Sequence, residues 1–154
     1  MRKLLFYTIL SSLIAFSFSC NKSIQEKERD QLADAVDNIG IKKDIDWIVI
    51  LPGLGCSGCI QEAEDFLKKN ANNKRIFFVL TKIESLKILQ QKTGVKIDEH
   101  SNIIVDRTDQ FIVPTDNSIY PCIIKFSEGE FLSHEFQSPD NSNAFEKLKA
   151  RVSL

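Results

Sequence analysis

Apolar residues along this chain follow two different periods, and the change from one to the other predicts an α/β protein. Residues 47–51 and 75–80 are apolar runs of strand length, which is typical of strands covered on both faces. Between these runs, Ile60, Ala63, Phe66 and Leu67 recur at helical spacing, up to about residue 70. A strand, a helix and a second strand in this order predict a right-handed parallel βαβ unit.

Further apolar patterns surround this unit. In chain order they predict a helix at 32–39, a helix at 81–93, a strand at 102–105, a hairpin of strands 119–126 and 131–136, and a helix at 145–152. Gly40 and Gly94 follow the first two helices as stop signals, and Thr81 and Glu84 have the spacing of a capping box. After the first helix, the predicted order is β-α-β-α-β-β-β-α.

The N-terminal residues have the pattern of an export signal. Two basic residues, Arg2 and Lys3, precede an apolar stretch at 4–18, which is shorter than the ~20 residues that span a bilayer. A small-residue context ends at Cys20, and this resembles the lipobox of bacterial lipoproteins, whose mature N-terminal cysteine carries lipid. We expect residues 1–19 to be a lipoprotein signal peptide, with the protein anchored to a membrane in an extracytoplasmic (periplasmic or cell-envelope) compartment. An ordinary signal peptide or an uncleaved anchor is the alternative.

Composition narrows the range of partners. Cleavage before Cys20 removes Arg2 and Lys3 and no acid, so the formal net charge falls from −1 to −3. The remaining chain has no basic patch interleaved with aromatic residues, so we expect no nucleic-acid partner. Its length suits one domain. We expect a polar tether and a short helix at 20–42, followed by the domain at 43–154.

Four cysteines set the candidate chemistry, because an exported protein can keep disulfides. With Cys20 lipidated, Cys56, Cys59 and Cys122 remain, and one pair plus an odd sulfur suits a working dithiol better than a disulfide scaffold. The pair lies where the strand ends at a Pro-Gly turn and the helix begins. Backbone N–H groups and the helix dipole favour a thiolate there, and a second sulfur one turn later can close a disulfide with it.

Three features together resemble the thioredoxin superfamily, in particular its membrane-tethered thiol–disulfide oxidoreductases of the TlpA-like type. They are the strand–Cys56-x-x-Cys59–helix unit, Tyr120-Pro121 opening a strand about sixty residues later, and the proline-led hairpin at 121–130. The resemblance covers residues 43–152. It implies a thioredoxin-like fold, with a central mixed β-sheet flanked by helices.

The same resemblance implies how the site works. Cys56 would be the attacking thiol and Cys59 the resolving one, so the redox-active disulfide needs no further cofactor. Pro121 would be the family's cis-proline, and Tyr120 would offer main-chain hydrogen bonds to an extended substrate. A trans proline at the start of an edge strand is the alternative. The expected partner is a protein or small-molecule thiol or disulfide.

Some residues depart from the family pattern. Gly55 stands where thioredoxin has a tryptophan, and Ile50 stands where it buries an acid behind the dithiol. Nothing in the sequence selects a replacement among Glu62, Glu64, Asp98 and Glu99. We expect Glu62 and Glu64 to be solvated charges on the helix. Because acidic residues early in the helix disfavour a thiolate, we lean toward the reductase direction.

Cys122 has two interpretations. Strand alternation turns its side chain away from Pro121 and toward the face of Tyr120 and Ile124. A free cysteine is most often buried, so an inert core thiol is the first interpretation. A third exchange partner for Cys56 or Cys59 is the second.

Three alternatives to disulfide exchange remain. Cys56, Cys59 and Cys122 with His100 or His134 could form a zinc or copper site, although only one C-x-x-C is present. A peroxidase would need a threonine that this cysteine turn lacks. A non-enzymatic binding module with a structural C-x-x-C disulfide is the third, although so short a loop stabilises weakly.

Overall fold

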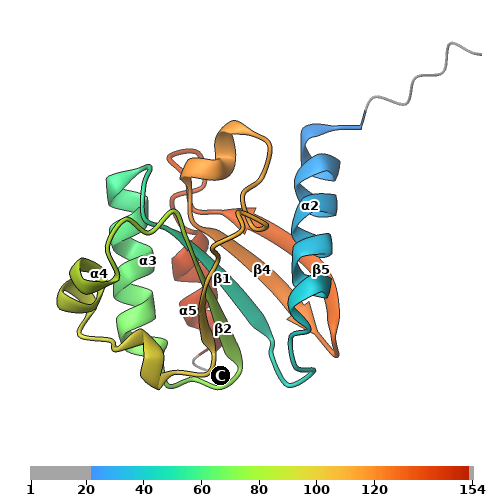
Figure 1. Ribbon diagram of the computed structural model, residues 1–154. Helices are drawn as coiled ribbons and strands as arrows, with labels where there is room; N and C mark the ends of the chain where they lie inside the picture. The colour runs from blue at the N-terminus through green and yellow to red at the C-terminus, as the bar shows by residue number, and fades with distance from the viewer. Residues whose placement is uncertain (1–21, 153–154) are drawn as a thin grey trace, which may run out of the picture.

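A five-stranded mixed sheet lies at the centre of the protein (Figure 1). The structure is a computed structural model, and it describes residues 22–152; the predictions for residues 1–19 and for Cys20 lie outside the described residues. The strand order is β3-β2-β1-β4-β5, with β1 at Trp47–Pro52, β2 at Ile76–Thr81, β3 at Ile103–Val105, β4 at Cys122–Ser127 and β5 at Glu130–Phe136. The first three strands are parallel, and β4 and β5 run antiparallel to their neighbours.

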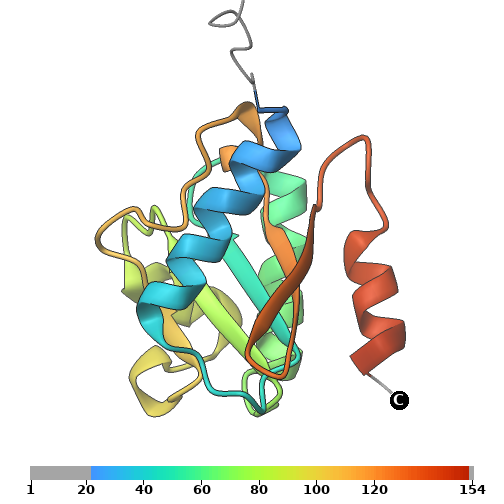
Figure 2. The ribbon, with the colours of Figure 1, turned by 90° about the vertical axis from the view of Figure 1, so that its right-hand side faces the viewer.

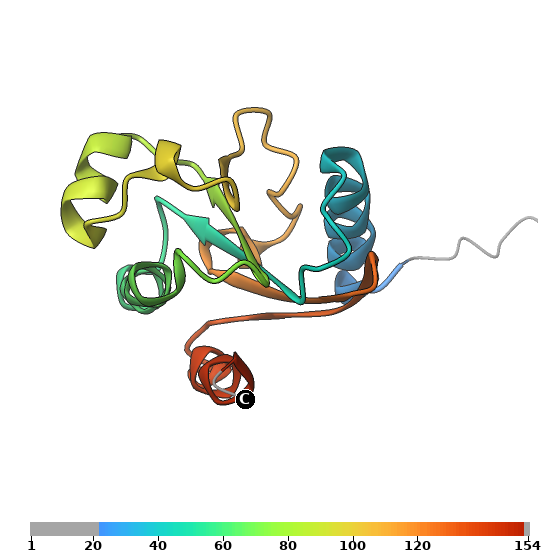
Figure 3. The same ribbon diagram turned by 90° about the horizontal axis from the view of Figure 1, so that it is seen from below.

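Helices cover both faces of this sheet. The helix α2 (Ile24–Ile39) lies on one face, and α3 (Ser57–Asn70) and α5 (Ala144–Val152) lie on the other, as Figures 2 and 3 show. The helix α4 (Leu86–Thr93) packs beside α3. The molecule therefore has three layers, and the α/β class is confirmed.

The strand β1 shows why the core has two halves. All six of its residues are buried, and successive side chains point to opposite faces. Val49 and Leu51 pack with Phe66 of α3, whereas Ile48 and Ile50 belong to the cluster under α2. A continuous apolar run is thus what a central strand between two helical layers requires.

The predicted element order and the parallel βαβ unit are confirmed, with two corrections to helix starts. The helix α2 begins at Ile24, so residues 24–31, which were expected to belong to the tether, are helical. Ser23 caps it, and Glu26 completes a capping box. Thr81 is the last residue of β2, and Ser85 is the N-cap of α4 instead. Within residues 22–152, no helix is long and apolar enough to cross a membrane.

Candidate functional site

Two glycines bring the chain from β1 to the cysteine pair. Gly53 N–H donates to the carbonyl of Thr81 at 2.8 Å, which ties the turn to the end of β2. Gly55 has a φ of +150°, and a Cβ at this position would overlap the carbonyl oxygen of Ile119. Only glycine fits here, because the backbone conformation and the close approach both exclude a side chain.

Cys56 is the N-cap residue of α3, and Cys59 lies in the first turn. Their Cα atoms are 5.4 Å apart, and their sulfur atoms lie at disulfide-bonding distance. Cys56 is partly exposed, whereas Cys59 is 8% exposed. The predicted position at a helix N-terminus is confirmed, and Cys56 is the more exposed residue of the pair, as predicted.

A distant segment borders this pair, as the sequence predicted. The short 3-10 helix η2 (Asp116–Ile119) ends at Ile119, whose carbonyl accepts a hydrogen bond from Cys56 N–H at 3.2 Å. Lys82 Nζ donates to the carbonyl of Ser118 at 3.3 Å. The residues directly before Tyr120 and Pro121 therefore contact the N-terminal end of α3.

The expectation of a cis-proline is wrong, because the described residues contain no cis peptide bond. The chain turns before Pro121 through η2, where Tyr120 N–H donates to the carbonyl of Asn117 at 3.0 Å. Tyr120 is extended, with φ −107° and ψ 145°, which is the conformation favoured before a trans proline. Pro121 then precedes β4, which lies between β1 and β5 and is not an edge strand.

Comparison of the sequence with protein-family models and with curated proteins finds no match. The chemistry of the site therefore rests on its own geometry.

Cys122 lies apart from the disulfide helix. It is a free, buried thiol at the start of β4, opposite Ile50 of β1, and it belongs to the cluster under α2. Burial raises the pKa of Cys122 well above the ordinary thiol value, and the charges of Glu28 and Glu135 raise it further. Because α3 packs on the opposite face, these positions favour a buried, unreactive thiol over a third exchange partner.

The charges near α3 differ from expectation. The first turn of α3 contains no acidic residue. Glu62 accepts a hydrogen bond from Gln137 Nε2 at 2.8 Å, and Glu64 pairs with Lys92 at 2.8 Å while its side chain is 13% exposed. Both were expected to be solvated, and this was wrong. The prediction of a reductase rested on acidic residues that disfavour the Cys56 thiolate. Without an acidic residue in the first turn, that prediction loses its basis.

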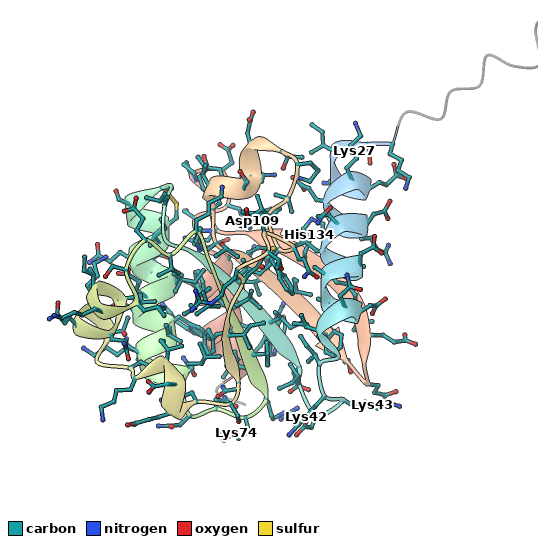
Figure 4. The ribbon with its side chains drawn as sticks, viewed as in Figure 1. Lys27, Lys42, Lys43, Lys74, Asp109 and His134 are labelled. Carbon is teal, nitrogen blue, oxygen red and sulfur yellow. A yellow bond between two sulfur atoms is a disulfide. The ribbon has the colours of Figure 1, made fainter. Side chains whose placement is uncertain are left out.

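Other candidate residues lie in ordinary structural contexts. Glu99 pairs with Lys96, next to Asp98 in the 3-10 helix η1 (Ile97–Glu99). His134 lies beside α2, with Nε2 at 3.4 Å from Glu28 Oε2 (Figure 4). Among residues 22–152, no group of three or more His, Cys, Asp or Glu side chains is arranged to hold a metal ion.

A cavity of about 610 Å³ opens beside the disulfide, between α3 and α4. Its wall includes Leu54, Gly55, Ser57 and Ile60. Leu54 is 48% exposed, and Ile119, whose carbonyl bonds to Cys56 N–H, is 41% exposed. The cavity thus lies next to the cysteine turn, and its wall combines apolar side chains with the charged side chains of Glu64, Asp65 and Lys92.

Sequence reasoning missed a buried carboxylate on α2. Glu28 is 2% exposed and is bonded to Thr115 and Asn117, the residues at the start of η2. One signal could have found it: Glu28 stands four and seven residues before Leu32 and Ala35, on the apolar face of the same helix.

Proposed function

We propose that this protein is a thiol–disulfide oxidoreductase that works through Cys56 and Cys59. The observation that carries the proposal is a pair of sulfurs at bonding distance at a helix N-terminus, with Cys56 accessible and Cys59 sheltered. Free backbone N–H groups at this end of α3 stabilise negative charge on Cys56. An accessible thiolate with a buried partner is what two-step exchange requires.

In the reduced protein, the Cys56 thiolate attacks one sulfur of a substrate disulfide, which forms a mixed disulfide and releases the first substrate thiolate. The Cys59 thiol then gives its proton to solvent, and its sulfur attacks the Cys56 sulfur. This step forms the Cys56–Cys59 disulfide and releases the second substrate thiolate, so that two electrons have passed from protein to substrate. An oxidase runs the same steps in reverse.

We also propose that the fold is thioredoxin-like and that the protein is related to the membrane-tethered oxidoreductases. Support comes from the mixed sheet between helical layers, the disulfide after β1, and a proline before β4 at the site. The trans bond before Pro121 is a departure from the family pattern. We further propose lipid attachment through Cys20, an extracytoplasmic location, and a protein or small-molecule thiol or disulfide as substrate.

Single-cysteine variants test the mechanism. Cys56→Ser should abolish reduction of a peptide disulfide, because the first attack is lost. Cys59→Ser should leave a mixed disulfide on Cys56, visible as added mass in intact-protein mass spectrometry without reductant. Cys122→Ala is the matched control and should retain the exchange rate. Full activity of Cys56→Ser, or a zinc adduct in place of a disulfide in the wild-type mass, would overturn the proposal.

The direction of electron flow follows from the reduction potential. Equilibration with glutathione buffers gives it directly. A value near about −270 mV would identify a reductant, and one near about −120 mV an oxidant. Because the first turn of α3 has no acidic residue, no charge in that turn opposes the thiolate.

A further inference from the structure

Glu28 is an acidic residue in a place where acids are rare. It lies on the buried face of α2 and is 2% exposed, next in the helical period to Leu32. A buried carboxylate is tolerated only when hydrogen bonds satisfy its oxygens. Here Oε1 accepts from the Thr115 hydroxyl and from Asn117 Nδ2, the latter at 2.8 Å, and Oε2 faces His134 Nε2 at 3.4 Å.

Both Oε1 donors belong to the short helix that borders the disulfide. Thr115 is the N-cap of η2, and its carbonyl accepts from Ser118 N–H at 3.1 Å. The carbonyl of Asn117 accepts from Tyr120 N–H. The carbonyl of Ile119, two residues after Asn117, accepts from Cys56 N–H. Hydrogen bonds at both ends of η2, connected through its backbone, thus join the Glu28 carboxylate to the N-cap of α3.

The arrangement in space agrees with this path. The segment η2, orange in Figure 1, lies between the N-terminal ends of α2 and α3. Lys82 holds it from the side of β2, through Ser118. Glu28 holds it from the side of α2. Within η2, two backbone hydrogen bonds stabilise the turn before Pro121, from Ser118 N–H to the Thr115 carbonyl and from Tyr120 N–H to the Asn117 carbonyl.

We propose that Glu28 is a positioning residue for the disulfide site. Its carboxylate holds η2 against the N-terminal end of α3, so that the segment from Ile119 to Pro121 is fixed in place when a peptide disulfide docks at Cys56. This role rests on the proposed function. It concerns how well a substrate is held, since Glu28 does not contact the sulfurs through any of its hydrogen bonds.

Amide hydrogen exchange on the oxidised full chain tests whether Glu28 holds η2 in place. Glu28→Ala should accelerate exchange of the Cys56, Ser118 and Tyr120 amides about tenfold, because two buried hydrogen bonds to η2 are lost. The Val49 and Val79 amides in the sheet should stay within about twofold. Glu28→Gln keeps an Oε1 acceptor and should restore most of the protection. Asp34→Ala, an exposed acid on the same helix, should change nothing.

Steady-state kinetics with a peptide disulfide test the role in docking. Glu28→Ala should raise KM about tenfold and leave kcat within about threefold, and Glu28→Gln should recover most of the KM, since only the held segment is affected. Asn117→Ala leaves α2 intact and should reproduce the effect, which keeps the test open if Glu28→Ala does not fold. A double-mutant cycle of these two changes should be strongly non-additive.

Each outcome decides the proposal. Equal acceleration of loop and sheet amides would show a merely structural role for Glu28, and unchanged loop amides would show no hold at all. Either result overturns the proposal, as does faster loop exchange with an unchanged KM. If the wild-type protein exchanges no disulfide, the proposed function fails, while the amide data still report whether Glu28 fixes η2.

Discussion

Gly55→Ala offers the sharpest test of how the disulfide site is assembled. The residue has a φ of +150°, which is accessible almost only to glycine and costs another residue about 1–3 kcal/mol. The new Cβ would also overlap the carbonyl oxygen of Ile119, so η2 must move away and Cys56 N–H loses its acceptor. Losing this hydrogen bond costs about a further 0.5–1.5 kcal/mol. The sum predicts a loss of about 1.5–4.5 kcal/mol in the free energy of unfolding.

Gly58→Ala is the matched control three residues along the same turn. Gly58 lies in the first turn of α3 with a helical backbone, and a Cβ there would meet no atom within 4 Å. Alanine at this position should therefore stabilise the protein by about 0.5–1 kcal/mol, through its better helix propensity. Urea unfolding of both variants, followed with the disulfide intact, measures the contrast. If Gly55→Ala loses no more stability than Gly58→Ala, the close contact between η2 and α3 does not exist in solution.

Two further predictions concern the core. Phe66→Ala should lower the free energy of unfolding by about 3–5 kcal/mol in urea, because its ring is buried at 5.3 Å from Phe145 and 6.2 Å from Phe78; a loss below about 1 kcal/mol would contradict the packing. Burial raises the pKa of Cys122, so the folded protein keeps this thiol protonated while the unfolded chain ionises it above about pH 8.5. The contribution of this thiol to the free energy of unfolding is therefore fully present below that pH and declines as pH rises above it. The free energy of unfolding of Cys122→Ala should decline less steeply than that of the wild type between neutral pH and pH 10. Equal slopes for the two proteins would refute the raised pKa.

The central part of the fold could be predicted from local pattern. The apolar runs that became β1 and β2 are continuous because both faces of a central strand are covered. The helix α3 shows its period clearly, since its buried residues are spaced for one face. The position of Cys56 at the start of α3 follows from these two elements and from the Pro-Gly turn between them.

Where prediction failed, a tertiary contact had overridden a local signal. Residues 24–31 are polar enough to suggest a tether, yet a capping box at Ser23 starts a helix there and packing against β5 completes it. The polar side chain of Glu28 concealed the apolar face of that helix. Its partners Thr115 and Asn117 are separated from it by 87 and 89 residues. Local patterns in a single sequence do not predict contacts between residues so far apart in the chain.

The geometry of Pro121 shows a related limit. Tyr-Pro before a strand is compatible with either isomer, because the tertiary amide makes the two nearly equal in free energy, with trans favoured by about 0.5–1 kcal/mol. Here η2 turns the chain before it reaches the proline, so Tyr120 enters β4 in an extended conformation and the trans bond suffices. The dipeptide alone therefore does not predict the isomer.

The disulfide site therefore depends on three separate segments that meet at one end of the sheet. The turn after β1 supplies Gly55 and Cys56, α2 supplies Glu28, and η2 lies between them with a hydrogen bond to each. The hydrogen bonds of Glu28 connect a change in α2 to Cys56 through η2, whereas a change at Gly55 acts on the contact directly. The two perturbations should consequently share one signature, faster exchange of the Cys56 and Tyr120 amides, and only Gly55→Ala should also introduce backbone strain. If Glu28→Ala and Gly55→Ala loosened different amides, η2 would not be the element that links α2 to the disulfide.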